Sequence, residues 1–258
     1  MQFETFSIKN IFASIILFCL IASVSEAQNR ITAIDKNRLN KDRFAGLHFD
    51  FHAVLGDTSI GKTFTPGLID SLILMVKPDF IQVDCKGHDG ISSYPTQVGN
   101  KPAHFDKDIM KIWREVTAKH GVPLFVHYSG VWDTRAIKLN PEWARTNADS
   151  SKDKNAISFL GGYAQNLMHP QLVELAKDYK LDGAWIDGDC WVLGTDYSPA
   201  VMQAFTKETG ITTVPRKRTD PHYFEWMEFN RKLFRNYITA YVNAAHQANP
   251  DFKITSNW

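Results

Sequence analysis

Two aspartates at the end of an apolar run are the residues in this chain whose type and spacing best suit catalysis. The segment GAWIDGDCW, residues 183–191, places Trp185, Asp187 and Asp189 at alternate positions, so a strand would carry all three on one face. A carboxylate flanked by glycines and an indole suits a nucleophile that attacks the anomeric carbon of a sugar. The structural alternative, that Asp187 caps a helix or a turn, is less favoured by the segment as a whole.

Asp189 has two open roles. It could pair with Asp187 as an acid/base, because retaining glycosidases hold their two carboxyl groups about 5–5.5 Å apart. It could instead bind a sugar hydroxyl or brace the loop, and we favour this second role. We therefore expect Asp187 to be the catalytic residue and Asp189 to be a substrate contact.

A second candidate group is the segment HFDFH, residues 48–52. Alternation predicts that His48, Asp50 and His52 share one strand face, where such residues could be metal ligands. A metal-dependent carbohydrate deacetylase or an amidohydrolase-type barrel is therefore an alternative function. The spacing differs from the His-x-His of amidohydrolases, and further ligands would have to come from strands after the fourth, which the chain largely lacks. We expect no metal or other cofactor here, and we predict that the three residues line the floor of a sugar pocket.

A third group follows the next predicted strand, in the segment CKGHDGISSYPT. Lys86, His88, the pair Asp89-Gly90 and the pair Pro95-Thr96 resemble a motif of the α-L-fucosidase family of retaining glycosidases. Members carry a lysine, two histidines, Asp-Gly and a hydrophobic residue, with Pro-Ser or Pro-Thr a few positions on. Gly87 stands where the first histidine would be. The resemblance implies that Lys86 and His88 contact the substrate, with His88 hydrogen-bonded to a sugar hydroxyl.

Two further segments extend the resemblance, in the same order along the chain. FVHYS at 125–129, with Trp132 shortly after it, is similar to the family's Tyr-Tyr-Ser strand and its tryptophan loop. The segment WIDG at 185–188 is similar to the family's Trp-Phe-Asp-Gly, whose aspartate is the nucleophile. The resemblance implies that His127, Tyr128, Trp132 and Trp185 shape a sugar pocket. The first strand departs from the family's His-Trp-Gly, so a related group of glycosyl hydrolases with the same scaffold is an equal alternative.

The elements that must position these residues follow a repeated pattern. Short apolar runs predict strands, and longer amphipathic segments between them predict helices, with a long tryptophan-rich loop after the third strand. This alternation predicts a parallel α/β sheet. Reactive residues at the carboxyl ends of the strands, without a glycine-rich phosphate turn, favour a (β/α)8 TIM barrel over a doubly wound sheet. The predicted strands are 45–52, 79–84, 122–128, 183–187 and 252–256, and the predicted helices are 66–76, 106–120, 170–179, 199–209 and 223–248.

The number of predicted strands and the targeting signal define the expected domains. Five of the eight strands of a barrel are present, so we expect residues 28–258 to be a barrel domain truncated after about the fifth strand. Residues 1–27 contain Lys9, an apolar run at 11–24 and the small residues of Ser25-Glu26-Ala27. These features predict a signal peptide cleaved after Ala27. We therefore expect a periplasmic or secreted product that is not held in the membrane after cleavage.

The composition of the mature part limits its partners. Its 28 basic and 26 acidic residues nearly balance, so the net charge does not indicate binding to nucleic acid or to a membrane surface. Cys85 and Cys190 are expected to be free thiols or small core residues rather than a disulfide. The favoured function is a retaining, exo-acting, α-L-fucosidase-like hydrolase acting on an oligosaccharide or glycan. A catalytically inactive carbohydrate-binding fragment is the remaining alternative, and nothing indicates the oligomeric state.

Overall fold

The computed structural model describes residues 45–188 and 194–256. The predicted signal peptide, Asp189 and Cys190 lie outside the described residues. No helix within these two ranges combines the length and the apolar character needed to cross a bilayer.

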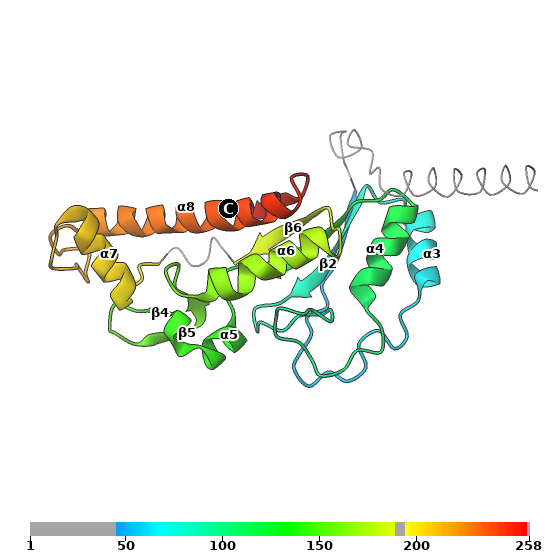
Figure 1. Ribbon diagram of the computed structural model, residues 1–258, viewed down its shortest axis with the longest axis horizontal. Coiled ribbons are helices and arrows are strands. Elements are labelled where there is room, and N and C mark those ends of the chain that lie inside the picture. Colours follow the sequence, from blue (N-terminus) through cyan, green and yellow to red (C-terminus); the bar gives the residue numbers. More distant parts are fainter. Residues whose placement is uncertain (1–44, 189–193, 257–258) are drawn as a thin grey trace, which may run out of the picture.

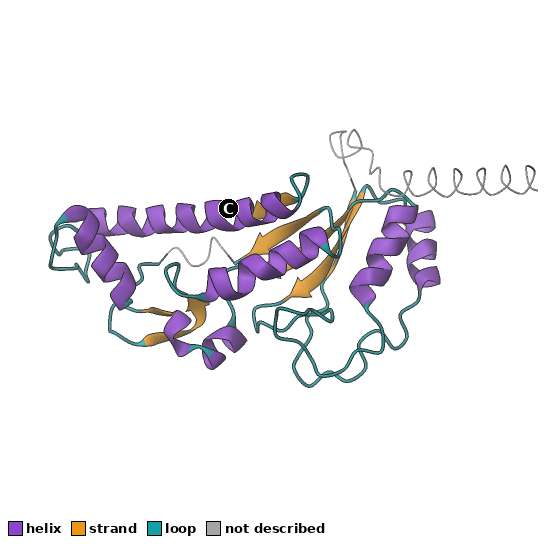
Figure 2. Ribbon diagram, viewed as in Figure 1, coloured by secondary structure: helices purple, strands orange, loops and turns teal. Residues whose placement is uncertain are grey.

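A five-stranded parallel sheet forms the centre of the molecule (Figures 1 and 2). Its strands are β1 (Gly46–Phe49), β2 (Phe80–Lys86), β3 (Leu124–Ser129), β6 (Gly183–Asp187) and β7 (Lys253–Ser256). They lie in the order β1-β2-β3-β6-β7, and each neighbouring pair is parallel. A doubly wound sheet reverses its order near the middle, whereas this order follows the chain in one direction. The topology therefore confirms the predicted barrel type of α/β fold.

The two faces of the sheet differ in character, as the alternation of side chains along each strand requires. One face is apolar and fully buried, and it includes Ile81, Val83, Val126 and Ile186. The other face carries polar and aromatic side chains, many of them partly exposed. The polar face is therefore the one that can meet a ligand.

The principal helices are close to those predicted, and local capping explains their bounds. They are α3 (Pro66–Val76), α4 (Ile109–Lys119), α6 (His169–Lys177), α7 (Pro199–Thr209) and α8 (Tyr223–Ala248). The Thr65 side chain caps α3 by accepting a hydrogen bond from the N–H of Leu68. The Asp108 carboxylate caps α4 in the same way, so this helix begins three residues later than expected. The helices α6 and α8 pack against each other along the sheet (Figure 1).

The prediction of a long loop after β3 is wrong. This region contains five short elements: α5 (Thr134–Leu139), the 3-10 helix η1 (Pro141–Trp143), β4 (Ala144–Thr146), β5 (Lys152–Ile157) and the π-helix η2 (Ala164–Met168). The strands β4 and β5 form an antiparallel hairpin. Figure 2 shows this hairpin and α5 grouped at the end of the sheet opposite α3 and α4. None of these elements is long enough to produce a full periodic pattern in the sequence.

The first strand is also shorter than predicted. Its pairing with β2 ends where Phe49 lies beside Val83, so Asp50 and His52 belong to the loop that follows β1. The expectation that these two residues share a strand face with His48 is therefore wrong. The loop returns over β2, where the N–H of Ala53 contacts the Ser93 hydroxyl.

Candidate active site

The parallel register brings the carboxyl ends of the central strands together. Asp84 of β2 lies beside His127 of β3, and Ser129 of β3 lies beside Asp187 of β6. Because neighbouring parallel strands end at the same edge of the sheet, their last polar side chains form one cluster. His88, in the turn after β2, completes it.

Asp187 ends β6 with a partly exposed carboxylate that two histidines approach. Its Oδ2 lies 3.2 Å from Nε2 of His127 and 3.4 Å from Nε2 of His88. Its Oδ1 accepts a hydrogen bond from the N–H of Gly188 at 2.7 Å. Gly188 has a positive φ of 86°, which a glycine adopts at no steric cost. The turn after the strand therefore holds one carboxylate oxygen while the histidines contact the other.

A second carboxylate, that of Asp84, holds His127 from the opposite side. Nδ1 of His127 lies 2.8 Å from Oδ1 of Asp84, and both side chains are buried. Nε2 of His52 lies 3.3 Å from the same oxygen and 2.8 Å from Oδ1 of Asp50. The rings of His52 and His127 stack with centroids 5.2 Å apart. A continuous chain of contacts thus runs from the loop after β1 to Asp187.

Burial and the contacts within this cluster shift the pKa values of three of its side chains. Burial alone would raise the pKa of the Asp84 carboxyl, but hydrogen bonds from His127, His52 and Ser93 outweigh it and leave the pKa below its ordinary value of 3.8. The hydrogen bond to Asp84 raises the pKa of His52 above 6.5, against an opposing effect of burial. Burial lowers the pKa of His88. Asp84 therefore stays ionised at neutral pH, and His88 favours its neutral form.

Gly87 makes room for the His52 ring. A Cβ at this position would lie 2.9 Å from Cγ of His52 and 3.1 Å from its Nδ1. Such a distance is too short for two non-bonded carbon atoms. The glycine in this motif therefore has a steric purpose, because any other side chain would move His52 from its contacts with Asp50 and Asp84.

Aromatic and polar side chains flank the cluster. Trp185 lies 5.2 Å from His127 and 6.0 Å from His48, measured between ring centroids. Trp132 meets His88 edge to face at 4.7 Å. Nδ1 of His48 lies 2.7 Å from Nε2 of Gln82, which fixes the His48 ring on the neighbouring strand. The structure thus brings eight of the predicted site residues to one face of the sheet: His48, Asp50, His52, His88, His127, Trp132, Trp185 and Asp187.

Lys86 and Tyr128 do not join this cluster, and their predicted contact with substrate requires correction. The register of β2 shifts between Asp84 and Lys86, so the two side chains point to different faces although they are two residues apart. The Lys86 ammonium instead contacts Asp133 and the Tyr163 hydroxyl, each at 3.1 Å, with 1% of the lysine side chain exposed. Tyr128 follows His127 directly and is fully buried, donating a hydrogen bond to Gln171 of α6. Both residues support the fold behind the site.

Asp84 is the site residue that sequence reasoning missed. Its position at the carboxyl end of an apolar strand was the available signal, the same one that pointed to Asp187. Asp50, His52, Asp84 and His127 also form a group whose ligand atoms lie within 4.8 Å of one another, and these four could hold a metal ion. The expectation that further metal ligands would have to come from strands after the fourth is therefore wrong, since β2 and β3 supply them.

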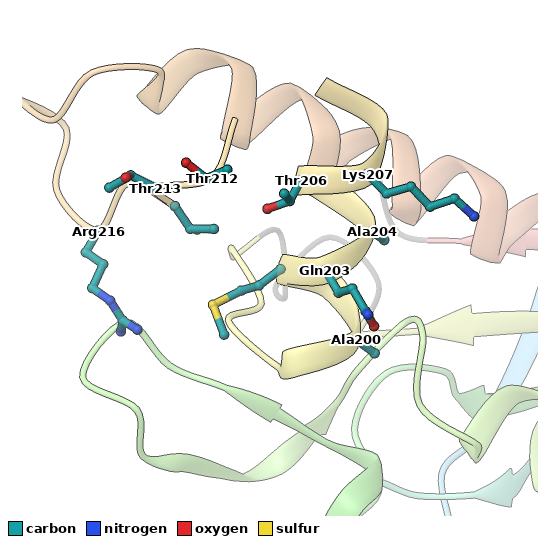
Figure 3. Close-up of a pocket in the computed structure, with 10 residues that line it drawn as sticks. Ala200, Gln203, Ala204, Thr206, Lys207, Thr212, Thr213 and Arg216 are labelled. Carbon is teal, nitrogen blue, oxygen red and sulfur yellow. The ribbon is translucent and has the colours of Figure 1, made fainter. Parts of the chain in front are cut away.

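A separate cavity of about 1130 Å³ lies between α7 and the segment that follows it (Figure 3). It contains none of the residues of the histidine and aspartate cluster. Its lining is mixed in character and includes Met202, Thr206, Val214 and Arg216. The histidines and aspartates of the candidate site therefore lie at the sheet edge and not in this cavity.

Comparisons with known proteins agree with the geometry. A model of the family described as alpha-L-fucosidase matches residues 76–253. The structure resembles alpha-L-fucosidase isoenzyme 2 from Paenibacillus thiaminolyticus with a TM-score of 0.68 and 21% identity, covering 84% of this chain and 32% of that chain. This likeness shows the fold, and the chain spans about a third of the length of that fucosidase.

Two further solved structures resemble this chain more distantly. A hypothetical protein from Ruminiclostridium thermocellum gives a TM-score of 0.48 at 11% identity, with 81% of this chain and 96% of that chain covered. An unliganded alpha-L-fucosidase from Lactobacillus casei gives 0.45 at 14% identity, with 88% and 68% covered. No curated protein matches the chain. The match to the family model extends over most of the sequence, and on that basis the chain belongs to the alpha-L-fucosidase family.

Proposed function

We propose that the chain is the part of an exo-acting, retaining α-L-fucosidase-like glycoside hydrolase that carries its nucleophile, Asp187. The observation that supports this most is the placement of the Asp187 carboxylate at the open edge of the sheet, with His88 and His127 against one of its oxygens. Family membership and the Trp185 ring on the same strand face agree with a sugar ligand.

In the proposed reaction, Asp187 attacks the anomeric carbon as the glycosidic C–O bond breaks, and the aglycone leaves as an alcohol after taking a proton from a general acid. Water then hydrolyses the glycosyl-enzyme intermediate, which releases the sugar with net retention and returns Asp187 to its carboxylate form. His127 holds the attacking carboxylate in place, and His88 offers a ring nitrogen to the same oxygen or to a sugar hydroxyl. Trp185 and Trp132 supply apolar surface for the sugar. In a retaining hydrolase, a second carboxyl group about 5–5.5 Å from the nucleophile serves as the acid/base.

The export signal is the second part of the proposal. The apolar run before Ser25-Glu26-Ala27 supports cleavage after Ala27 and action on a glycan outside the cytoplasm. The mass of the chain recovered from the periplasm or medium tests this directly. A chain that keeps residues 1–27 would contradict it.

A panel of aryl glycosides tests the activity, with the α-L-fucoside beside α- and β-galactosides. The chain and its Asp187→Asn variant are assayed together, and both are checked for folding by circular dichroism. We expect hydrolysis of one glycoside by the chain and a loss of at least a thousandfold in the variant, because the nucleophile is removed. No turnover by a folded chain would instead favour a sugar-binding or metal-dependent function.

A further inference from the structure

We propose that Asp50, His52, Asp84 and His127 form a binding site for one divalent transition-metal ion of the zinc class. The four residues come from two strands and one loop, and they meet beside Asp187. Nothing in the proposed glycosidase reaction requires such an ion, so this site goes beyond that function.

The chemistry of the donor set supports zinc and its neighbours. Two imidazole nitrogens and two carboxylate oxygens suit Zn²⁺ or Co²⁺, whereas Mg²⁺ and Ca²⁺ prefer oxygen ligands alone. One potential ligand atom from each residue lies within 4.8 Å of the others. Four-coordinate zinc, with bonds of about 2.0–2.2 Å, separates its ligands by about 3.3–3.6 Å. The successive ligand atoms of Asp50, His52, Asp84 and His127 lie 2.8–3.3 Å apart. This is close to the zinc spacing, so small side-chain shifts would admit the ion.

Half of the proposed site is held rigidly. Asp84 and His127 are buried at its base, and the Ser93 hydroxyl donates to the Asp84 oxygen that faces away from His127. Asp50 and His52 are about half exposed and lie in the loop after β1. A site with a fixed base and an open outer side can take up an ion from solution without unfolding.

The surroundings of His127 match those of known metal-ligating histidines. Such a histidine almost always donates its second ring N–H to a carboxylate or carbonyl, which fixes the ring and its tautomer. If Nδ1 of His127 binds the ion, its Nε2 carries the proton and faces Oδ2 of Asp187 at 3.2 Å. The carboxylate that accepts this N–H, and so orients the metal ligand, is then that of the proposed nucleophile.

The contacts of Asp84 also favour a cation. Its carboxylate is buried, and its contacts come from two imidazoles and a hydroxyl rather than from lysine or arginine. A divalent ion between these groups would supply the positive charge that the buried carboxylate faces and could bind all four residues at once.

A link to sugar binding follows, and this part alone rests on the proposed glycosidase function. An ion beside Asp187, open to solvent on the side of Asp50 and His52, can accept sugar hydroxyls as additional ligands. It would then orient the sugar over the nucleophile. Metal removal would weaken substrate binding while leaving the bond-breaking groups in place.

The experiment uses the full chain, without a histidine tag, stripped of metal by a chelator and titrated with Co²⁺, whose four-coordinate complexes absorb visible light intensely. Zn²⁺ is then added to displace it. The test variants are Asp84→Asn, His127→Gln and the more exposed His52→Gln. The control is Asp70→Asn, which removes the carboxylate of a surface pair with His120 (2.6 Å). All variants are checked for folding by circular dichroism.

We expect one Co²⁺ per chain, displaced by Zn²⁺, with equal affinity in the wild type and in Asp70→Asn. Each ligand variant should bind the ion at least about tenfold more weakly, since loss of even a residue that only hydrogen-bonds to a metal ligand lowers metal affinity about 10–100-fold. Absence of stoichiometric binding by the folded wild type overturns the proposal, as does affinity unchanged in the ligand variants. Metal binding without glycoside turnover would leave this site standing and refute only the proposed function.

Discussion

We predict that replacement of Lys86, whose ammonium lies 3.1 Å from the Asp133 carboxylate, strongly destabilises the fold. The resemblance to fucosidases predicts that Lys86 contacts the sugar, whereas the structure buries its ammonium against Asp133 with 1% and 0% of the two side chains exposed. Lys86→Met keeps the aliphatic length of the side chain and removes its charge. Asp133 then remains buried with one strong contact fewer.

The magnitude follows from the burial of the pair. Removal of one partner from a buried ion pair costs about 3–5 kcal/mol. Asp133 keeps its hydrogen bond from the N–H of Ala136 at 2.7 Å, so we expect the lower end, about 3 kcal/mol. The matched control is Lys119→Met, because Lys119 pairs with Asp70 on the surface with 66% of its side chain exposed. That pair should contribute about 0–1 kcal/mol.

Urea unfolding followed by tryptophan fluorescence measures the difference. With a slope of about 3 kcal/mol per molar urea, Lys86→Met should lower the midpoint by about 1 M, and Lys119→Met should lower it only slightly. Equal midpoints for the two variants would refute the buried pair. If Lys86→Met kept its stability and instead raised KM for the glycoside that the chain cleaves in the proposed panel, the sugar contact would be correct.

Two further predictions concern the cluster itself. Gly87→Ala should push the His52 ring outward, because the new methyl would lie 2.9 Å from Cγ of His52. We therefore expect a higher KM for the glycoside that the chain cleaves and little change in the midpoint of thermal unfolding. Gly67→Ala in α3, where a Cβ meets nothing within 4 Å, is its control, and equal KM values for the two variants would contradict the prediction. Asp84→Asn should lower the free energy of unfolding at pH 7 by about 1–3 kcal/mol, because buried hydrogen bonds to a charged group are lost. Since the pKa of folded Asp84 lies below 3.8, its stabilisation is complete above that value and is lost as the pH falls through the folded pKa. The stabilisation from His52 has the opposite pH dependence, because its pKa is raised in the folded state. This stabilisation is complete below pH 6.5 and declines as the pH rises through the folded pKa. Urea unfolding of the wild type and of Asp84→Asn, repeated from pH 6 downward, should therefore show that the difference between their unfolding free energies shrinks in acid. A difference independent of pH would show that the charge of Asp84 is not its cause.

The main elements were predictable because the hydrophobic pattern determines them strongly. The bounds of α7 and α8 match the prediction, since Pro199 begins α7, Gly210 ends it and α8 is long enough for many helical periods. The end of β1 could not be predicted in this way. The alternation of HFDFH continues past Phe49, but the hydrogen bonds to β2 stop there. Pairing with a neighbouring strand, and not the local pattern, determines where a strand ends.

Site residues were predictable where the neighbouring residues of one strand indicate them. They were not predictable where their position depends on how two strands pair. Asp187 stands out by its neighbours in sequence. The face on which Lys86 lies depends on a register shift in β2, which leaves no trace in residue types. The position of Asp84 at the end of its strand is a weak signal, and its role becomes clear from its contact with His127, which is 43 positions away in the sequence and 2.8 Å away in space.

A comparison of Gly87 with the family motif, one position at a time, gives the wrong conclusion about the site. The glycine stands where the family motif has a histidine, which would indicate that a sugar contact has been lost. In the structure, the space above Gly87 is filled by the His52 ring, which arrives from the loop after β1. An imidazole is therefore present at this part of the sheet edge although the motif lacks it. The His52 ring occupies the space that a side chain at position 87 would need, so the absence of the motif histidine is not an argument against a sugar site here.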